Sequence, residues 1–318
     1  MHIDRLDAWS GELDQLAAGA PQSTFYHTAT WLRSLSDAYP RMTLRVLVAS
    51  DNGMPRAFLP YFESRRGPLR TLWSLPFGTY GGPAGDESAC AQLWDEYRGM
   101  FSSPGVIDVG CIDRDAGLRA EGWESTDLST HVVDISRGFD HLWHHQLDKP
   151  RRRRVRRAAE AGVTVRRGNG VEDMAAFMHV YRERLKDWKS GGGHPETLFF
   201  SLLANGGEHV RLYVAEHGGA VVGGHLNFYY KDAVIAWYGM TSTQAGDTQA
   251  GTLLYSECMR EACEAGYRTY NLGASLGKRS LIEYKESLGG TPVSYRMLRR
   301  RRLGGRVAAL VRRASRPA

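Results

Sequence analysis

The sequence predicts an α/β protein with a mixed sheet in each of two similar domains. Short alternating or β-branched runs, which are typical of strands, are interleaved with helical stripes along the whole chain. The same order of elements also occurs twice, complete in the second half and weaker in the first. With 318 residues, the chain has the length of two domains of ordinary size.

The second half contains the complete series, in the order β-α-α-β-β-β-α-β-α-β. Tight turns at His217-Gly218-Gly219 and Lys231-Asp232 join its three central strands into an antiparallel meander. Pro195 opens one helix and Gly266 ends another, as expected at helix starts and ends. The predicted bounds are 163–167, 171–189, 195–204, 210–216, 220–230, 233–239, 249–265, 267–272, 279–288 and 291–298.

The first half repeats part of this series, in the order α-α-β-β-β-α-β. Asn52-Gly53 indicates a hairpin between its first two strands, because Asn-Gly readily adopts positive φ. The predicted bounds are 5–16, 28–38, 42–50, 56–64, 69–75, 87–100 and 106–110. An internal duplication explains the repeat. We therefore predict domains at 1–135 and 136–299, joined near residues 128–140, and a basic tail at 300–318.

Composition limits the class of protein. Hydrophobic residues make up 42% of the chain and aromatic residues 10%, which is enough for a packed core. No stretch approaches the ~20 apolar residues that span a bilayer. The N-terminus lacks the apolar run of a signal peptide, so we expect a cytoplasmic location. The four cysteines lack CxxC spacing and are expected to be reduced thiols.

The net charge of +6 is concentrated in two places. Nine arginines and no acid follow from Arg296 onward, and Lys149 to Arg157 carry seven positive charges in nine residues. Both clusters predict an anionic partner, either RNA or an anionic membrane surface. Apolar residues at helical spacing in the tail fit an amphipathic helix on membrane or RNA, or a disordered end. The sequence leaves these alternatives open.

The order of elements in the second half is that of the GNAT acyltransferase fold, and several short stretches resemble the Fem peptidyltransferase family of tandem GNAT proteins. They are a basic helix from Lys149 with the strand start Gly162-Val163, the strand Tyr270-Asn271-Leu272 with the loop Gly273-Ala274-Ser275, the pair Tyr284-Lys285 before Gly289-Gly290, and the loop from Pro76 to Gly82. The resemblance implies a complete catalytic second domain and a degenerate first domain that binds the acceptor. It covers nearly all of the chain up to Arg299.

The resemblance also implies substrates. The donor would be an aminoacyl-tRNA, used as a co-substrate without a cofactor, and the acceptor an amine on a peptidoglycan precursor, a small peptide or a natural product. Relatives that use acyl-CoA supply the alternative, an acyl-CoA-dependent N-acetyltransferase acting on an envelope sugar or a small amine. A third alternative is a non-catalytic binding protein. We expect a monomer, and the chain lacks the helical hairpin with which some Fem proteins grip tRNA.

The catalytic residues that we predict are Lys285, Tyr238 and Gly239. Acyl transfer to an amine needs hydrogen-bond donors for the developing oxyanion. In a GNAT fold the acyl carbonyl docks on an exposed strand backbone, here residues 237–240, where Gly239 would permit close approach. A glycine in a simple bulge is an equal alternative. The resemblance assigns Lys285 to the oxyanion or to a donor phosphate, whereas a solvated helix lysine is the simpler reading of the residue alone.

We predict two groups of binding residues. Those for the donor are Ser275, Lys278, Arg279 and Tyr284, and those for the acceptor are Tyr80, Gly81, Asp108, Arg152 and Arg156. The loop 244–251 lacks the glycine spacing of an acyl-CoA loop and carries Asp247, which favours another donor. Candidate general bases are Asp108 and Glu257, although proton transfer within the substrates needs neither. His141 and His145 have no third ligand at metal spacing, so no metal site is predicted.

Overall fold

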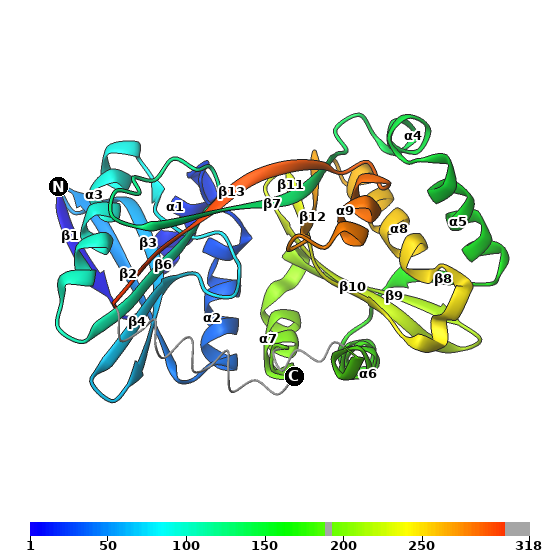
Figure 1. The fold of residues 1–318 in the computed structure, drawn as a ribbon, viewed down its shortest axis with the longest axis horizontal. Coiled ribbons are helices and arrows are strands. Elements are labelled where there is room, and N and C mark those ends of the chain that lie inside the picture. The colour runs from blue at the N-terminus through cyan, green and yellow to red at the C-terminus, as the bar shows by residue number, and fades with distance from the viewer. Residues whose placement is uncertain (188–192, 303–318) are drawn as a thin grey trace. The chain divides into compact units, whose positions relative to one another are not determined.

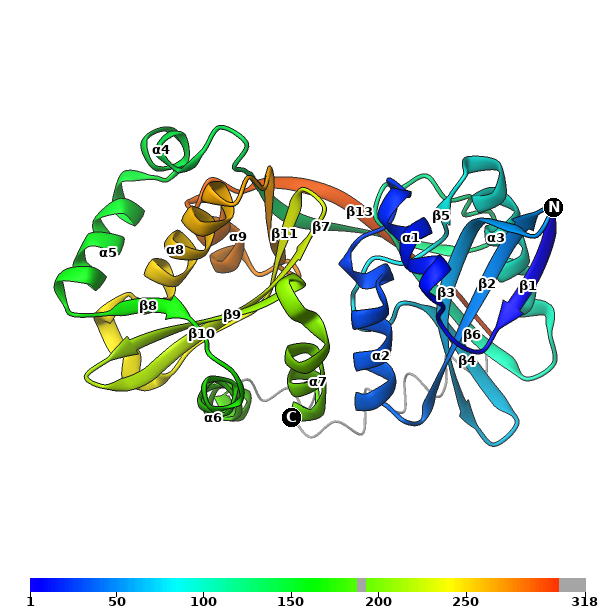
Figure 2. The same cartoon turned by 180° about the vertical axis from the view of Figure 1, so that it is seen from behind.

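The computed structural model describes residues 1–187 and 193–302 and divides into two compact units. The first unit comprises Met1–Leu128 and the segment from Ser294, and the second comprises Ser129–Val293. Figures 1 and 2 show the first unit in blue and cyan, with the red-orange end of the chain, and the second in green to orange. The last strand, which the sequence assigned to the second domain, therefore completes the sheet of the first.

In the first unit, six strands lie in the order β1-β2-β3-β4-β6-β13. All neighbours are antiparallel except β4 and β6, and the short β5 pairs with β3. The strands are β1 (His2–Leu6), β2 (Met42–Asp51), β3 (Met54–Arg66), β4 (Leu69–Ser74), β5 (Ala84–Gly85), β6 (Val106–Asp113) and β13 (Thr291–Arg301). The helices are α1 (Gly11–Gly19), η1 (Phe25–His27), α2 (Ala29–Ala38), α3 (Glu87–Gly99) and η2 (Met100–Ser102).

The hairpin predicted at Asn52-Gly53 is present, since both residues have positive φ, at 50° and 78°. The helix predicted at 5–16 is wrong at its start. His2–Leu6 forms a strand that pairs with β2, and the helix begins only at Gly11. The alternation of charged and apolar residues there is the signal of an edge strand, which the helical reading overlooked.

In the second unit, six strands lie in the order β7-β12-β11-β10-β9-β8. They are β7 (Glu124–Asp134), β8 (Thr164–Arg167), β9 (Val210–His217), β10 (Ala220–Tyr230), β11 (Ala233–Thr241) and β12 (Thr269–Ala274). The helices are α4 (Phe139–His141), η3 (Leu142–Gln146), α5 (Lys149–Glu160), α6 (Val171–Asp187), α7 (Glu196–Gly206), η4 (Gly207–His209), η5 (Thr243–Thr248), α8 (Ala250–Glu264) and α9 (Arg279–Glu286). The strand β7 lies where the sequence suggested only a linker.

Helices cover both faces of this second sheet, with α5 and α8 side by side on one face and α6 and α7 on the other (Figures 1 and 2). Neighbouring residues of β10 point to opposite faces, as the period of a strand requires. A Cβ on Gly224 would overlap the ring of Phe177 from α6, whereas His225 packs on Tyr255 from α8, with ring centroids 4.3 Å apart. Both faces are therefore closed by helices.

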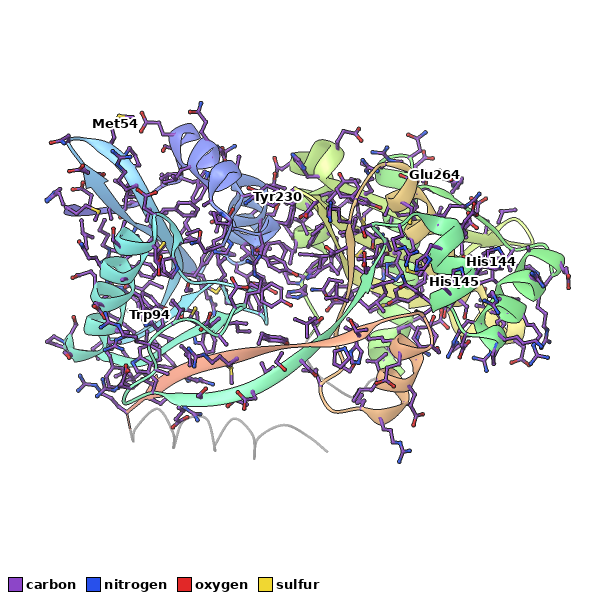
Figure 3. The ribbon with its side chains drawn as sticks, turned by 90° about the horizontal axis from the view of Figure 1, so that it is seen from above. Met54, Trp94, His144, His145, Tyr230 and Glu264 are labelled. Atoms are coloured by element: carbon purple, nitrogen blue, oxygen red, sulfur yellow. The ribbon has the colours of Figure 1, made fainter. Side chains whose placement is uncertain are left out.

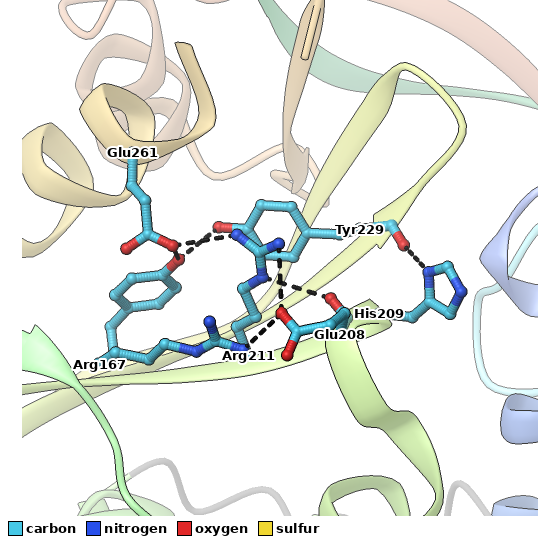
Figure 4. Close-up of polar contacts among 7 residues, drawn as sticks. Arg167, Glu208, His209, Arg211, Tyr229 and Glu261 are labelled. Carbon is cyan, nitrogen blue, oxygen red and sulfur yellow. Dashed lines mark hydrogen bonds and ion pairs between the residues drawn. The ribbon is translucent and has the colours of Figure 1, made fainter. Parts of the chain in front are cut away.

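A polar network ties α8 to the strands beneath it (Figure 4). The Tyr213 hydroxyl donates to Glu261 at 2.6 Å and lies 2.8 Å from the Tyr229 hydroxyl. Arg211 donates to the same Glu261 carboxylate at 3.0 Å and covers the Tyr229 ring at 4.1 Å. Burial raises the pKa of both tyrosines, so their hydroxyls stay protonated and keep donating. The network holds α8 in a fixed position on the sheet.

Within the described ranges, no helix is both long and apolar enough to cross a membrane.

Candidate active site

The strands β11 and β12 part near the middle of the second sheet. Their parallel ladder runs only from Ala233 paired with Thr269 to Ile235 paired with Asn271, whereas β11 stays paired with β10 up to Thr241. Between Ala236 and Tyr238 the register shifts by one residue, which makes Trp237 the extra residue of a β-bulge. A bulge bends its strand, so it accounts for the divergence. The edge of β11 from 236 to 240 is left without a partner strand in the described structure.

Gly239 lies on this edge, and it is exposed. A Cβ at this position would overlap the imidazole of His225, which faces Gly239 across the β10–β11 ladder. Gly239 is not itself the bulge residue, because Trp237 is. The glycine makes room for the His225 ring on one side of the strand and leaves the backbone open on the other.

His225 is 1% exposed and held in one tautomer. Its Nδ1 lies 2.8 Å from Asn227 Oδ1, and because an amide oxygen only accepts, the proton is on Nδ1. The Asn227 amide nitrogen in turn donates to the Tyr270 hydroxyl at 3.1 Å. Burial lowers the pKa of His225 to about 4, so the ring is neutral at pH 7. Its Nε2 has no hydrogen-bond partner among the described residues.

Lys285 from α9 reaches the end of β12 beside this opening. The side chain is 3% exposed, and Nζ donates to the carbonyls of Gly273 at 2.6 Å and Ala274 at 2.9 Å. A Cβ on Gly273 would lie 4.0 Å from Nζ and 3.8 Å from the Ala236 carbonyl oxygen of β11. The ammonium therefore lies where the unpaired edge begins. An ammonium has three protons to donate, and two are used here.

The lysine has no carboxylate partner in the part of the chain that the structure describes. Burial without a counter-charge lowers the pKa of Lys285 to about 8. Near pH 7 the side chain is thus mostly a cation, with one N–H free for a substrate oxygen. Such a group suits the stabilisation of an oxyanion in a water-poor site.

Two further buried polar side chains lie beside Lys285 without partners. Ser275 follows the two carbonyls that hold Nζ, is 2% exposed, and has an unpartnered Oγ. His131 on β7 is 1% exposed, and neither ring nitrogen has a partner among the described residues. A Cβ on Gly290 would lie 2.8 Å from the Lys285 carbonyl oxygen and 3.2 Å from His131 Cβ. Burial, together with the charge of Lys285, lowers the pKa of His131.

Buried polar atoms without partners are uncommon in folded proteins, and each calls for a bound water or ligand. Those of His225 and Ser275 belong to residues next to Gly239 and to the end of β12, and those of His131 belong to β7, the strand that pairs with β12 on its other side. Sequence reasoning missed the two histidines. For His225 the available signal was a histidine at an inward-facing position of a largely apolar strand, whereas His131 lies on a strand that was itself not predicted.

Comparison with known proteins identifies this arrangement. Residues 149–286 match a family model described as an acetyltransferase (GNAT) domain. The matched residues all lie in the second unit, which therefore contains a region similar to GNAT acetyltransferase domains. No curated protein matches the chain at a significant level.

Solved structures extend the likeness to both units. FemX superposes with a TM-score of 0.70 at 12% identity, covering 92% of this chain and 96% of FemX. The C-terminal domain of a putative lysylphosphatidylglycerol synthetase from Agrobacterium fabrum gives 0.59 at 16% identity, covering 85% of this chain and 87% of that domain. A tandem GNAT protein from the clavulanic acid biosynthesis pathway gives 0.56 at 15%, covering 94% and 98%. The chain thus has the tandem GNAT fold, and the predicted resemblance to Fem-like proteins is confirmed.

In the second unit, Tyr238 turns its side chain into an aromatic cluster. Its ring centroid lies 5.6 Å from that of Tyr181 and 5.4 Å from that of Phe199. Burial raises the pKa of Tyr238, and a hydrogen bond with Tyr181 opposes that shift. Tyr238 therefore reaches the opening through its backbone, while its side chain anchors the strand.

The predicted donor residues divide between the interior and the surface. Tyr284 packs on Tyr255, with centroids 5.9 Å apart, and carries the Arg151 guanidinium 4.2 Å above its ring. Lys278 and Arg279 are exposed at the start of α9, and Arg279 pairs with Glu283 at 2.7 Å. Tyr284 and Ser275 thus lie next to Lys285, whereas Lys278 and Arg279 face solvent.

The predicted acceptor residues fall in different units. In the first unit, the Tyr80 ring meets Tyr26 and Tyr295 edge-on, at 6.1 and 5.4 Å. Gly81 donates its N–H to Ile112 at 2.9 Å, and a Cβ there would overlap the Ser74 carbonyl. Close packing within the first unit is therefore enough to explain why residue 81 is a glycine.

Asp108 in the same unit is engaged by Arg299. The guanidinium donates to the carboxylate at 2.8 Å and lies 5.1 Å above the Trp73 ring. The aspartate is 8% exposed. A carboxylate paired with a half-buried arginine is a poor general base, so the contacts of Asp108 indicate a structural role.

We expect Asp108→Ala to lower the free energy of unfolding by about 2 kcal/mol, because the half-buried Arg299 charge would lose its partner. Urea denaturation measures the change. Asp115→Ala is the matched control, since Asp115 pairs with Arg114 at the surface and should change stability by less than about 0.5 kcal/mol. Equal losses of unfolding free energy in the two variants would show that the Asp108–Arg299 pair stabilises the protein no more than a surface ion pair. A raised KM for the acceptor would additionally support the predicted binding role.

In the second unit, the side chains of Arg152 and Arg156 contact residues that precede α5. Arg152 donates to the carbonyls of Trp143 at 2.8 Å and His144 at 3.0 Å, and Arg156 lies 5.9 Å from the Trp143 ring.

Figure 3 places His144 and His145 on the segment that leads into α5. The rings of His141 and His145 stack at 4.8 Å, but the described residues contain no group of three or more metal-ligating side chains.

Proposed function

We propose that this tandem GNAT protein is a cytoplasmic aminoacyltransferase that moves an aminoacyl group from aminoacyl-tRNA to an amine acceptor. The observation that carries the proposal is the buried Lys285 at the end of β12. It has two carbonyl partners, no carboxylate partner in the described residues and one N–H left to donate. This is the arrangement that a developing oxyanion requires.

In the proposed reaction, the ester carbonyl of the donor lies along the free edge of β11, with its oxygen toward Lys285 Nζ. The neutral amine attacks this carbon, and the C–N bond forms as the charge on the oxygen grows. The ester C–O bond then breaks. The proton that the amine loses passes to the leaving ribose oxygen, so the products are an amide and uncharged tRNA. No side-chain base is required for this balance.

Two observations support an aminoacyl donor. The segment before α8, where a GNAT protein would hold a CoA pyrophosphate, is folded into η5. There the Thr243 N–H donates to Glu183 at 2.9 Å, which brings a carboxylate to this site. The fold is also shared with FemX and with a domain named for lysylphosphatidylglycerol synthesis. By analogy, the acceptor would be a peptidoglycan precursor, a small peptide or a natural product.

The alternative is an acyl-CoA-dependent N-acetyltransferase acting on an envelope sugar or a small amine. The description of the matching family model, an acetyltransferase domain, favours it. So does the tandem GNAT neighbour whose own description refers to AcCoA.

Mass spectrometry of products separates the two. The purified protein is incubated with a panel of amines and either charged tRNA or acetyl-CoA, with ribonuclease-treated charged tRNA as the control. We expect an amine that gains the mass of an amino-acid residue, only with intact charged tRNA. Acetylated product, together with CoA binding by calorimetry, would replace the proposal with its alternative.

The pKa of Lys285 predicts the pH dependence. Above about pH 8 the ammonium loses its proton, so kcat should fall, approaching tenfold per pH unit. Stability should change the other way. The unfolded chain holds this proton up to about pH 10.4, so between pH 8 and that value the contribution of Lys285 to the free energy of unfolding rises with pH. Rate profiles and urea titrations between pH 7 and 10 check both signs. An unchanged kcat up to pH 10 would contradict the assignment.

A further inference from the structure

We propose that three exposed arginines of α5, here called the arginine face, bind the phosphate backbone of the tRNA donor. They are Arg153, Arg154 and Arg157. This inference rests on the proposed function. It adds a surface that binds the tRNA part of the donor. The sequence had instead assigned Arg152 and Arg156 of the same helix to the acceptor.

The structure separates the arginines of α5 by their contacts. Arg151 donates to Ser287 Oγ at 2.6 Å and covers the Tyr284 ring. Arg152 donates to the carbonyls of Trp143 and His144, and Arg156, although exposed, lies 5.9 Å from the Trp143 ring. Arg153, Arg154 and Arg157 are exposed and make no such contact, and their spacing of three and four residues puts them on one side of the helix.

Among the described residues, the arginine face lacks carboxylate partners within ion-pair distance, although Glu160 follows Arg157 on the same helix. Within the described part of the chain, none of its three guanidinium groups forms an ion pair. Arginines elsewhere in the same unit are paired, for example Arg167 with Glu208 and Arg182 with Glu196, at 2.9 and 2.7 Å. Like charges three and four residues apart on a helix repel one another. A bound polyanion would remove this repulsion.

The helix that carries the arginine face contacts the segment that carries Lys285. Arg151, the residue two before Arg153, stacks on Tyr284, and Tyr284 precedes Lys285 on α9. The charge of Arg154 acts on the Tyr284 hydroxyl as well. From there α5 runs for twelve residues, about 18 Å. A donor whose acyl ester lies at Lys285 would thus bring its nearest phosphates along α5.

The chemistry of the face favours RNA over a membrane. A helix that lies on a membrane presents apolar side chains beside its basic ones. The apolar residues Val155 and Ala158 of α5 are buried in the core of the unit instead. What remains outside is a row of guanidinium groups, whose planar fork matches phosphate oxygens.

The test compares the triple variant R153Q/R154Q/R157Q with the double variant R167Q/R182Q, which removes surface arginines that have carboxylate partners. Binding of charged tRNA is measured at several salt concentrations. We expect the triple variant to bind about 10- to 100-fold more weakly, with the slope of log affinity against log salt reduced by about 2. The double variant should bind like the wild type.

A second arm uses a minimal donor, an amino acid esterified to a 3′-terminal dinucleotide, which is too short to follow α5. The triple variant should use it at the wild-type rate. Wild-type affinity and salt slope for tRNA in the triple variant would overturn the arginine face. Two other results for the triple variant would overturn it as well. One is a loss of rate with the minimal donor as large as the loss with tRNA, and the other is normal tRNA binding with weaker binding to vesicles that contain phosphatidylglycerol. If the wild type makes no product from charged tRNA, the proposed donor itself is wrong and the inference falls with it.

Discussion

Replacing Lys285 with methionine is expected to lower kcat by about 10²–10³-fold with little change in KM. The reason is that its free N–H serves the oxyanion, which exists only in the transition state. Losses of this size follow removal of one preorganised oxyanion donor. Methionine keeps the length and apolar volume of the lysine stem, so the packing around α9 is preserved. Single-turnover rates with charged tRNA and an excess of amine give the measurement.

The control for this substitution is a measurement of stability, which shows whether the variant is folded. The variant leaves the carbonyls of Gly273 and Ala274 without their donor, yet it also removes a buried charge without a counter-ion, and these effects oppose each other. We therefore expect a midpoint of urea unfolding close to that of the wild type. The fall of kcat above pH 8 should be absent in the variant. A folded Lys285→Met protein with wild-type kcat would refute the catalytic role.

Substituting Gly239 with alanine is the second large effect. The new Cβ would overlap the buried His225 ring, so one of the two strands must shift. Overpacking of this kind costs about 1–3 kcal/mol. A shift of the β11 edge would also misplace the acyl carbonyl, for which a loss of about 10²-fold in kcat/KM is expected. Urea denaturation and steady-state kinetics measure the two effects.

A double-mutant cycle with His225→Ala separates packing from substrate approach. Removing the ring creates the space that the alanine methyl needs, so the double variant should be about 1–2 kcal/mol more stable than the sum of the single losses. Purely additive losses would mean that His225 is not the obstacle. Activity that stays low in the more stable double variant would support direct approach of the donor to Gly239.

Much of the fold was predictable because it depends on local patterns. The strand at Ala220–Tyr230 has the predicted bounds, since alternation and two tight turns define it. The partner of the last strand was not predictable. The pattern of 291–301 specifies a strand but contains nothing that selects β6 over a strand of the second unit. The strand β7 was missed because its outer part alternates weakly, among polar residues.

The site divides in the same way. The Tyr284-Lys285 segment was found through a family resemblance, but burial of Nζ against two carbonyls depends on how α9 docks on β12. His131 and His225 were missed because a histidine within a strand is usually a packing residue. On α5, four consecutive arginines do not indicate which of them face solvent. The contacts in the structure were needed to decide whether Arg152 or Arg153 is available to a ligand.

A crystal structure with a stable donor analogue tests the central claim most directly. In 3′-amide-linked aminoacyl-adenosine, the labile ester of the charged tRNA end is replaced by an amide. We expect its acyl carbonyl along the free edge of β11 near Gly239, with the oxygen within hydrogen-bonding distance of Lys285 Nζ. A carbonyl bound elsewhere, with Nζ still contacting only Gly273 and Ala274, would contradict the account.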